Sequence, residues 1–390
     1  MILTKGTAGD LIPFIGAGHA LHVRGHDVTI VSHCVYKSLA RHAGLKFVEL
    51  DDSHERESFL NDIHLLNTPK GVAVFFERHC LPRVLREYGI LARLTTSGPA
   101  VLLTRHMASL ADLLAAERLQ LPLVRVFTAR SQVATLGLLE ELLRTLFSNQ
   151  IGALRRHLGL PGSCDWGAFL RLATANIGNW PDWFAEGETG LSIPVRPVGF
   201  LKYDPAESGE IPSNIETFLQ RRKPAVLVSP GTGDFLSKEF YSASILGCIR
   251  AGLLCVLVSA FRRLLPEELC DSVRWVPYLP FASAMPRFAA VIHHGGSGTI
   301  ARAIDAGIPQ LILPYGADRP DNALRLKRLG IADCLPASMW KAETVAVALD
   351  RLLSSAELRH RCSLFADKVH QEVPCQHLCD HIERIASSHA

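Results

Sequence analysis

The sequence lacks a long hydrophobic run: its apolar stretches fall well short of the ~18–20 residues that a membrane-spanning helix needs. The first residues, MILTKGTAGDLIPF, contain no extended apolar segment with a small-residue cleavage site, so we expect no secretory signal. The sequence also lacks a large excess of charge of one sign, because the net charge is only +3 over 390 residues. Nucleic-acid-binding proteins usually concentrate basic residues on one face, and no basic run occurs here. These absences predict a cytoplasmic protein that does not bind nucleic acid.

Cysteine is not concentrated in one part of the chain, because the ten cysteines are scattered over its whole length. Without a secretory signal, this usage indicates reduced thiols. One segment, PCQHLCDH, holds Cys375, His377, Cys379 and His381, which are residue types that bind zinc. On a helix the two cysteines share one face, whereas the two histidines point about 160° away. Four ligands from this segment cannot converge, so we expect a half-buried helix here and no metal site in the protein.

The length and the 48% hydrophobic content indicate two folded domains, because ordinary domains hold roughly 100–200 residues. In the first half, short apolar segments rich in β-branched residues alternate with helical segments, which predicts a parallel sheet with crossover helices. The expected strands are residues 1–5, 26–33, 45–50, 99–105, 121–128 and 194–200. The first expected helix ends near residue 24, and further helices are expected at residues 35–44, 107–120 and 136–160.

The second half restarts this alternation, with expected strands at 225–233, 253–260, 273–280, 289–296 and 309–316. The predicted fold class is therefore α/β, with two doubly wound halves. In such folds ligands bind at the carboxyl ends of the strands, where the strand order reverses, and two halves that face each other would form a cleft. The expected boundaries are a first domain at 1–200, a linker at 201–222, a second domain at 223–372 and a terminal helix at 373–390.

A glycine-rich turn, VIHHGGSGT (residues 291–299), stands between an expected strand and an expected helix. Glycine lets the backbone approach a ligand closely, and the free N–H groups of a helix N-terminus favour anions, phosphates above all. The serine and threonine can cap the helix or donate hydrogen bonds, and a neighbouring histidine can donate to a phosphate oxygen. The turn predicts a phosphate site, and the alternative is an ordinary connection to a capped helix.

Three related motifs fit this chain less well. A P-loop requires a lysine after its last glycine, and none follows here. A nucleophile elbow requires G-x-S-x-G, but Thr299 replaces the last glycine. A dinucleotide-binding turn requires G-x-G-x-x-G, whereas the first turn has only Gly6 and Gly9, and the next strand ends without an acidic ribose ligand. The sequence therefore disfavours a P-loop, a serine hydrolase and a nicotinamide-dependent enzyme.

The first glycine turn, KGTAGDLIPF, places Asp10 at the start of the first helix. An aspartate in this position is often a helix cap. The alternative is a general base, or a charge that orients one. The sequence pattern alone leaves both interpretations open.

Residues 291–330 resemble the donor-binding signature of the family 1 glycosyltransferases with the GT-B fold, and residues 6–32 resemble the opening of its bacterial branch. That branch contains the rhamnosyltransferases of rhamnolipid synthesis, antibiotic and macrolide glycosyltransferases, and sterol glucosyltransferases. The resemblance spans essentially the whole chain. It implies two Rossmann-like domains facing across a cleft, the first binding the acceptor and the second the nucleotide-sugar, with the terminal helix crossing back to the first domain.

The resemblance also implies roles for single residues. Asp10 matches an aspartate proposed as the base, and no histidine precedes it in the turn, where the plant branch has one. The donor-binding residues implied are His294, Gly296, Ser297, Gly298 and Thr299 for the diphosphate, Gly231 and Thr232 near the phosphates, Trp275 and Val276 beside the base, and Asp318 at the sugar hydroxyls. Arg319 stands where the family usually has glutamine, so it either reads a different sugar or acidic group or turns away.

The resulting hypothesis is an inverting, metal-independent hexosyltransferase. It would move a sugar from a UDP- or dTDP-sugar to a hydroxyl of a small apolar acceptor, such as a natural product, a lipid or a sterol-like molecule. No cofactor is expected beyond this nucleotide-sugar co-substrate. Two alternatives stay open: a nucleotide-sugar epimerase on the same fold and a non-catalytic nucleotide-sugar-binding protein. Peripheral membrane contact and the choice between monomer and homodimer stay open as well.

Overall fold

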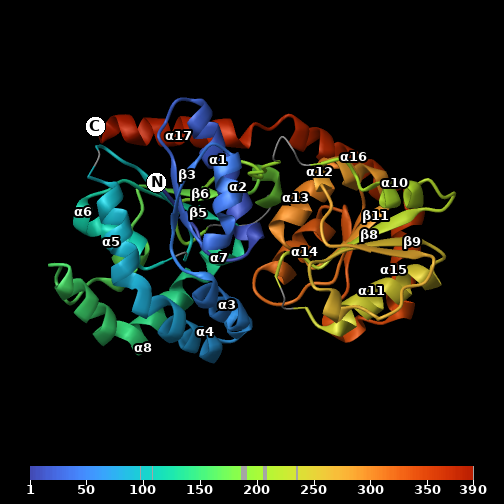
Figure 1. Ribbon diagram of the computed structural model, residues 1–390, viewed down its shortest axis with the longest axis horizontal. Coiled ribbons are helices and arrows are strands. Elements are labelled where there is room, and N and C mark those ends of the chain that lie inside the picture. The colour runs from blue at the N-terminus through green and yellow to red at the C-terminus, as the bar shows by residue number, and fades with distance from the viewer. Residues whose placement is uncertain (97, 108, 186–190, 205–208, 234–235, 390) are drawn as a thin grey trace. The chain divides into compact units, whose positions relative to one another are not determined.

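The computed structural model describes residues 1–96, 98–107, 109–185, 191–204, 209–233 and 236–389. The chain divides into two compact units, one made of residues 1–203 and 373–390 and the other of residues 204–372. Each unit is built on a parallel sheet with helices on both faces (Figure 1). Among the described residues, no helix is both long enough and apolar enough to cross a membrane.

The first unit contains a seven-stranded sheet in the order β3-β2-β1-β4-β5-β6-β7. Its strands are β1 (Ile2–Leu3), β2 (Thr29–Ser32), β3 (Lys46–Glu49), β4 (Leu102–Arg105), β5 (Leu123–Phe127), β6 (Ala175–Gly178) and β7 (Arg196–Pro197). The chain runs outward from β1 to β3 and then continues with β4 on the other side of β1. The strand order therefore reverses between β1 and β4, the place where ligands bind in open parallel sheets.

Apolar side chains cover both faces of this sheet, because successive strand residues point to opposite sides. Ile2 and Ile30 join one buried cluster, and Leu3 and Val31 join the other. The first cluster is covered by α1 (Ala8–Val23), α2 (Lys37–His42) and α17 (Pro374–Ser388), and the second by α5 (Val84–Leu94), α6 (Ala111–Leu119) and α8 (Leu136–His157). The unit also contains α3 (Ser53–Asn61), α4 (Pro69–Phe75), α7 (Ser131–Ala134) and α9 (Trp166–Leu170).

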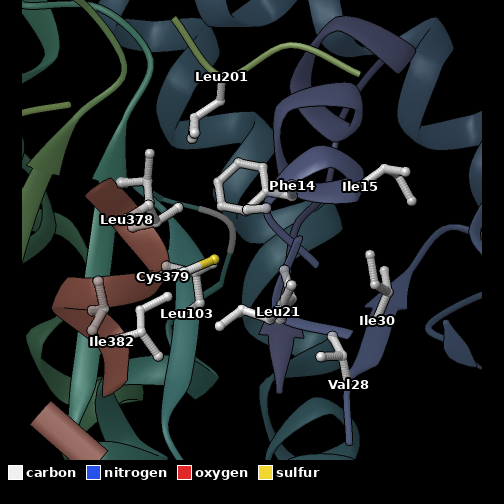
Figure 2. Packing of buried hydrophobic residues seen from close by; sticks show 14 of the residues in the cluster. Phe14, Ile15, Leu21, Val28, Ile30, Leu103, Leu201, Leu378, Cys379 and Ile382 are labelled. Carbon is white, nitrogen blue, oxygen red and sulfur yellow. The ribbon is translucent and has the colours of Figure 1, made fainter. Parts of the chain in front are cut away.

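Helix α17 belongs to the first unit although it follows the whole second unit in the chain. Its apolar contacts with α1 include Phe14, Leu21, Leu378, Cys379 and Ile382 (Figure 2). At the edge of this contact, Nη1 of Arg24 lies 2.6 Å from Oδ1 of Asp380. Cys379 is buried and His377 is exposed, as expected for a half-buried helix. Within the described part of the chain, no three His, Cys, Asp or Glu side chains are grouped to hold a metal ion.

The second unit contains a six-stranded sheet in the order β10-β9-β8-β11-β12-β13. Its strands are β8 (Ala225–Ser229), β9 (Leu254–Val258), β10 (Val273–Val276), β11 (Ala290–His293), β12 (Gln310–Ile312) and β13 (Ala332–Cys334). The order reverses between β8 and β11. The second unit therefore repeats the doubly wound plan of the first, and its ligand site is expected at the carboxyl ends of these two strands.

Helices cover both faces of the second sheet as well. One face carries α11 (Lys238–Arg250) and α15 (Ala342–Ser354), the other carries α10 (Ser213–Leu219), α12 (Phe281–Ala284) and α13 (Ser297–Asp305), and α14 (Arg319–Arg328) and α16 (Ala356–His370) complete the unit. The range 201–222, predicted as a linker, contains α10. Its Ile215 and Phe218 are buried in the core of the second unit. The surrounding residues are polar, so the sequence pattern does not indicate this short helix. Residues 205–208 of that range lie outside the described part.

Candidate functional site

Two glycine turns leave the second sheet where its strand order reverses. Ser229 at the end of β8 and His293 at the end of β11 are register partners on these adjacent strands. Gly231 and Gly295 stand two residues beyond them, with φ angles of +87° and +95°. Residues with a Cβ atom are strained at such positive φ angles. Both turns therefore depend on glycine, and they begin at the same level of the sheet.

The imidazole of His294 lies between these turns. A Cβ atom on Gly231 would be 2.3 Å from Cε1 of His294, and a Cβ atom on Gly296 would be 2.7 Å from the same carbon. His294 is only 6% exposed. Burial, followed by the positive charge of Arg319 and the proximity of His293, holds the pKa of His294 well below its ordinary value. The ring is therefore neutral near pH 7 and carries one N–H group.

His293 supports the turn from inside the core. The backbone N–H of Gly295 donates to Nδ1 of His293 at 3.1 Å. Nε2 therefore carries the proton and donates to Oε1 of Gln310 at 3.0 Å. Burial lowers the pKa of this fully enclosed ring to about 4. His293 is thus a neutral structural residue that fixes the backbone next to His294.

Helix α13 begins directly after the second turn. Gly296 is its N-cap, and no side chain of the described residues caps it. The N–H groups of the first turn, from Ser297 to Thr299, have no carbonyl partner within the helix and lie at the positive end of its dipole. Gly298 is exposed, whereas Thr299 is buried. This helix end can hold an anion such as a phosphate.

The start of α14 is attached to the same turn. Nδ2 of Asn322 donates to the carbonyl oxygen of Gly295 at 3.0 Å and to Oδ2 of Asp318 at 3.2 Å. The carbonyl oxygen of Arg319 lies 3.1 Å from the position that a Cβ atom on Gly295 would take. Asp318 and Arg319 therefore lie beside the turn. Asn322 was not predicted, although its place one helical turn after Asp318 was a usable signal.

Trp275 and Val276 stand on β10, two strands away from β8. Nε1 of Trp275 donates to the carbonyl oxygen of Ser259 at 2.8 Å, and the guanidinium of Arg262 lies 5.8 Å from the ring centroid. The half-buried Trp275 can offer part of its ring to a ligand. Val276 is buried in the core, so only its backbone can reach one. A side-chain contact between Val276 and a base is therefore not supported.

In the first unit, Asp10 lies in the first turn of α1. Its Oδ2 accepts hydrogen bonds from the backbone N–H of Thr7 at 2.9 Å and from Oγ1 of Thr7 at 3.2 Å. Its Oδ1 lies 3.7 Å from Nη1 of Arg105 and accepts no hydrogen bond from the described residues. The hydrogen bonds at the start of the helix therefore use one oxygen of Asp10, whose side chain is 30% exposed. Arg105 was not predicted, although it is the last residue of an expected strand.

Residues that follow β2 form hydrogen bonds with the turn before Asp10. Gly6 has a φ of +128°, and a Cβ atom on it would lie 2.4 Å from Oδ2 of Asp10. Its N–H donates to Nε2 of His33 at 3.0 Å, and its carbonyl accepts from the hydroxyl of Tyr36 at 3.2 Å. Nδ1 of His33 in turn donates to the carboxylate of Asp51. Sequence reasoning missed His33 and Tyr36, which fix both peptide groups of Gly6.

Two known glycosyltransferase domains match the sequence. The glycosyltransferase family 28 N-terminal domain matches residues 1–135, and the C-terminal domain of erythromycin biosynthesis protein CIII-like proteins matches residues 253–383. O-mycaminosyltylonolide 6-deoxyallosyltransferase of Streptomyces fradiae is 26% identical, over 99% of this chain and 97% of its own length. Sterol 3-beta-glucosyltransferase of Saccharomyces cerevisiae is 23% identical over 95% of this chain but only 34% of its own length. The chain thus spans about a third of that relative.

The same fold occurs in solved glycosyltransferases. The crystal structure of the glycosyltransferase VinC, determined in complex with dTDP, matches with a TM-score of 0.73 at 18% identity over 99% of both chains. The predicted GT-B fold class is thereby confirmed. With glycosyltransferase domains matched at both ends and relatives that span its length, this chain is a glycosyltransferase with the GT-B fold.

Proposed function

We propose that the protein transfers a hexose from a UDP- or dTDP-sugar to a hydroxyl group of a small apolar acceptor, with inversion at the anomeric carbon. The observation that carries this proposal is the ring of His294, held between two glycine turns at the uncapped start of α13. A neutral imidazole N–H, backbone N–H groups and a helix dipole together suit a diphosphate, the group that leaves when the sugar is transferred.

The diphosphate gains negative charge as the sugar leaves it. Preorganised donors that face such developing charge lower the reaction barrier. The turn supplies His294 and the first N–H groups of α13, and Arg319 adds a cation whose charge acts on His294. These groups support transfer without a divalent cation. Asp318 would bind hydroxyls of the sugar, and Trp275 would lie against the base.

Asp10 is the proposed base for the acceptor hydroxyl. Its side chain is 30% exposed, while the hydrogen bonds from Thr7 to Oδ2 fix the carboxylate. General-base help of this kind typically contributes ~10²–10⁴-fold to the rate. Relatives named for O-mycaminosyltylonolide and for sterols support an apolar hydroxylated acceptor, and the dTDP complex of VinC supports a nucleoside diphosphate donor.

The test is an activity screen of the purified protein. UDP- and dTDP-sugars are combined with a library of apolar hydroxylated compounds, products are identified by mass spectrometry, and their anomeric configuration is determined by NMR. A glycoside of inverted configuration supports the proposal, and a retained configuration contradicts inversion. Conversion of the donor into another nucleotide-sugar without acceptor would indicate an epimerase. Donor binding with no product of either kind would indicate a non-catalytic binding protein.

A further inference from the structure

Arg105 approaches the Asp10 turn from the neighbouring strand. It is the last residue of β4, which pairs with β1 where the strand order reverses. Its Nε donates a 3.1 Å hydrogen bond to the carbonyl oxygen of Lys5, the residue that precedes Gly6. The ammonium of Lys5 is buried and pairs with Glu87 at 2.7 Å. The guanidinium of Arg105 is therefore attached to a backbone segment that is itself fixed from inside the unit.

The guanidinium and the carboxylate face each other across a gap. Nη1 of Arg105 and Oδ1 of Asp10 are 3.7 Å apart, which exceeds the roughly 2.7–2.9 Å of a charge-assisted hydrogen bond. The side chains of Asp10 and Arg105 are 30% and 18% exposed, so both reach solvent. An oxygen atom about 2.7 Å from Oδ1 and about 2.9 Å from Nη1 can bridge the two groups. Such an atom would donate one hydrogen bond and accept another, which a hydroxyl group does.

We propose that the acceptor hydroxyl occupies the gap between Asp10 and Arg105, and that Arg105 is a second catalytic residue. The hydroxyl donates to Oδ1 of Asp10 and accepts a hydrogen bond from Nη1 of Arg105. This assignment rests on the proposed function, because it places the nucleophilic oxygen of that reaction.

The transfer step then balances as follows. The hydroxyl proton passes to Oδ1 of Asp10, and the acceptor oxygen forms a bond to the anomeric carbon. The bond between that carbon and the diphosphate oxygen breaks, and its electron pair leaves with the diphosphate. While the proton departs, negative charge develops on the acceptor oxygen. The N–H of Arg105 stabilises this charge, as preorganised donors stabilise oxyanions.

A purely structural role for Arg105 makes a different prediction. If Arg105 only held the turn through the carbonyl of Lys5, its loss would slow transfer to every acceptor by the same factor. If it stabilises charge on the acceptor oxygen, the loss depends on how readily that oxygen carries charge. A phenolic oxygen, with a pKa near ~10 for its free form, needs less help than an aliphatic one.

The experiment compares R105M, R105K and the control R144M, which removes an arginine on the exposed side of α8. Rates are measured for wild type and variants with a coumarin bearing a phenolic hydroxyl, a coumarin of similar size bearing a hydroxymethyl group, and water, through donor hydrolysis. We expect R105M to lower kcat by about 10²–10³-fold with the aliphatic hydroxyl and by clearly less with the phenol. R144M should match wild type, and calorimetric affinity for UDP or dTDP should be the same in all proteins.

R105K provides the test of Arg105 if R105M does not fold. Its single ammonium can reach the carbonyl of Lys5 or the acceptor oxygen but cannot span both as a guanidinium does, so kcat should still fall more for the aliphatic acceptor. Equal losses for both coumarins, or wild-type kcat in R105M, would overturn the role of Arg105. A wild-type protein that transfers sugar neither to these three acceptors nor to any compound of the acceptor library would instead contradict the proposed function itself.

Discussion

The ring of His294 occupies the space that a side chain on Gly231 would need. A Cβ atom at Gly231 would lie 2.3 Å from Cε1 of His294, and the φ of +87° disfavours any other residue. We expect G231A to weaken binding of UDP or dTDP by roughly 10–100-fold, because small displacements in a preorganised site have effects of this size. Titration calorimetry with the nucleotide alone measures this loss.

G252A is the matched control for that substitution. Gly252 also has a positive φ, +72°, but a Cβ atom there would meet nothing within 4 Å. The change should cost about 1–2 kcal/mol of stability through backbone strain and leave nucleotide affinity unchanged. Equal losses of affinity in both variants would mean that the contact with His294 is irrelevant.

Arg319 is predicted to bind the diphosphate rather than the sugar. Its backbone lies against the turn at Gly295, and its charge contributes to the low pKa of His294. R319Q should weaken binding of UDP or dTDP by about tenfold, the size of one hydrogen bond to a charged group, and reduce the dependence of affinity on salt. R328Q, at the exposed end of α14, should change neither. Unchanged nucleotide affinity with altered sugar preference in R319Q would contradict this assignment.

Divalent cations are predicted to be dispensable for transfer. The turn around His294, the start of α13 and Arg319 supply donors for the diphosphate charge. Treatment with EDTA should therefore change kcat by less than about twofold, whereas a metal that stabilised the leaving group would contribute several kcal/mol. A loss of activity that Mg²⁺ restores would show that these donors are insufficient.

The sequence made the central strands predictable because they are continuous apolar runs. Strands β4, β5, β8, β9 and β11 all fall inside predicted segments. Strands β6 and β13 were missed, since segments as short as ANIG and ADC contain polar residues and carry no pattern of their own. Their pairing with a neighbouring strand, not their composition, makes them strands.

The site followed the same rule. Gly231, His294 and Asp10 could be singled out because each lies in or beside a glycine-rich turn that follows a strand. His33 and Arg105 could not be assigned, because their partners in the first turn lie 27 and 100 residues away along the chain. Only the parallel arrangement of β2, β1 and β4 brings these residues together.

Acid should destabilise the protein partly through His293. Burial lowers its pKa from the ordinary 6.5 to about 4, so between these values the unfolded chain binds a proton that the folded chain does not. The free energy of unfolding therefore falls as the pH decreases through this window and is fully retained above about pH 6.5. From pH 7 to pH 5 the contribution of this ring is about 2 kcal/mol.

H293Q isolates that contribution from those of the other buried histidines. Glutamine does not titrate and can still accept a hydrogen bond from Gly295. Urea denaturation at pH 7 and pH 5 should show a smaller loss of stability in H293Q than in wild type. The same loss in both proteins would mean that His293 is not responsible.

Asp10→Asn tests the role of the proposed base most directly. Asparagine retains an oxygen for the N–H of Thr7, so the start of α1 stays capped, but its amide cannot take the acceptor proton. D52N is the matched control, because Asp52 caps α3 of the same unit by accepting from the N–H of Glu55 at 2.8 Å. The measurement is kcat for sugar transfer, with UDP or dTDP affinity determined on the same samples. We predict that D10N loses about 10²–10⁴-fold in kcat with unchanged nucleotide affinity, while D52N keeps the wild-type rate; near-normal transfer by D10N would contradict the assignment of Asp10 as the base.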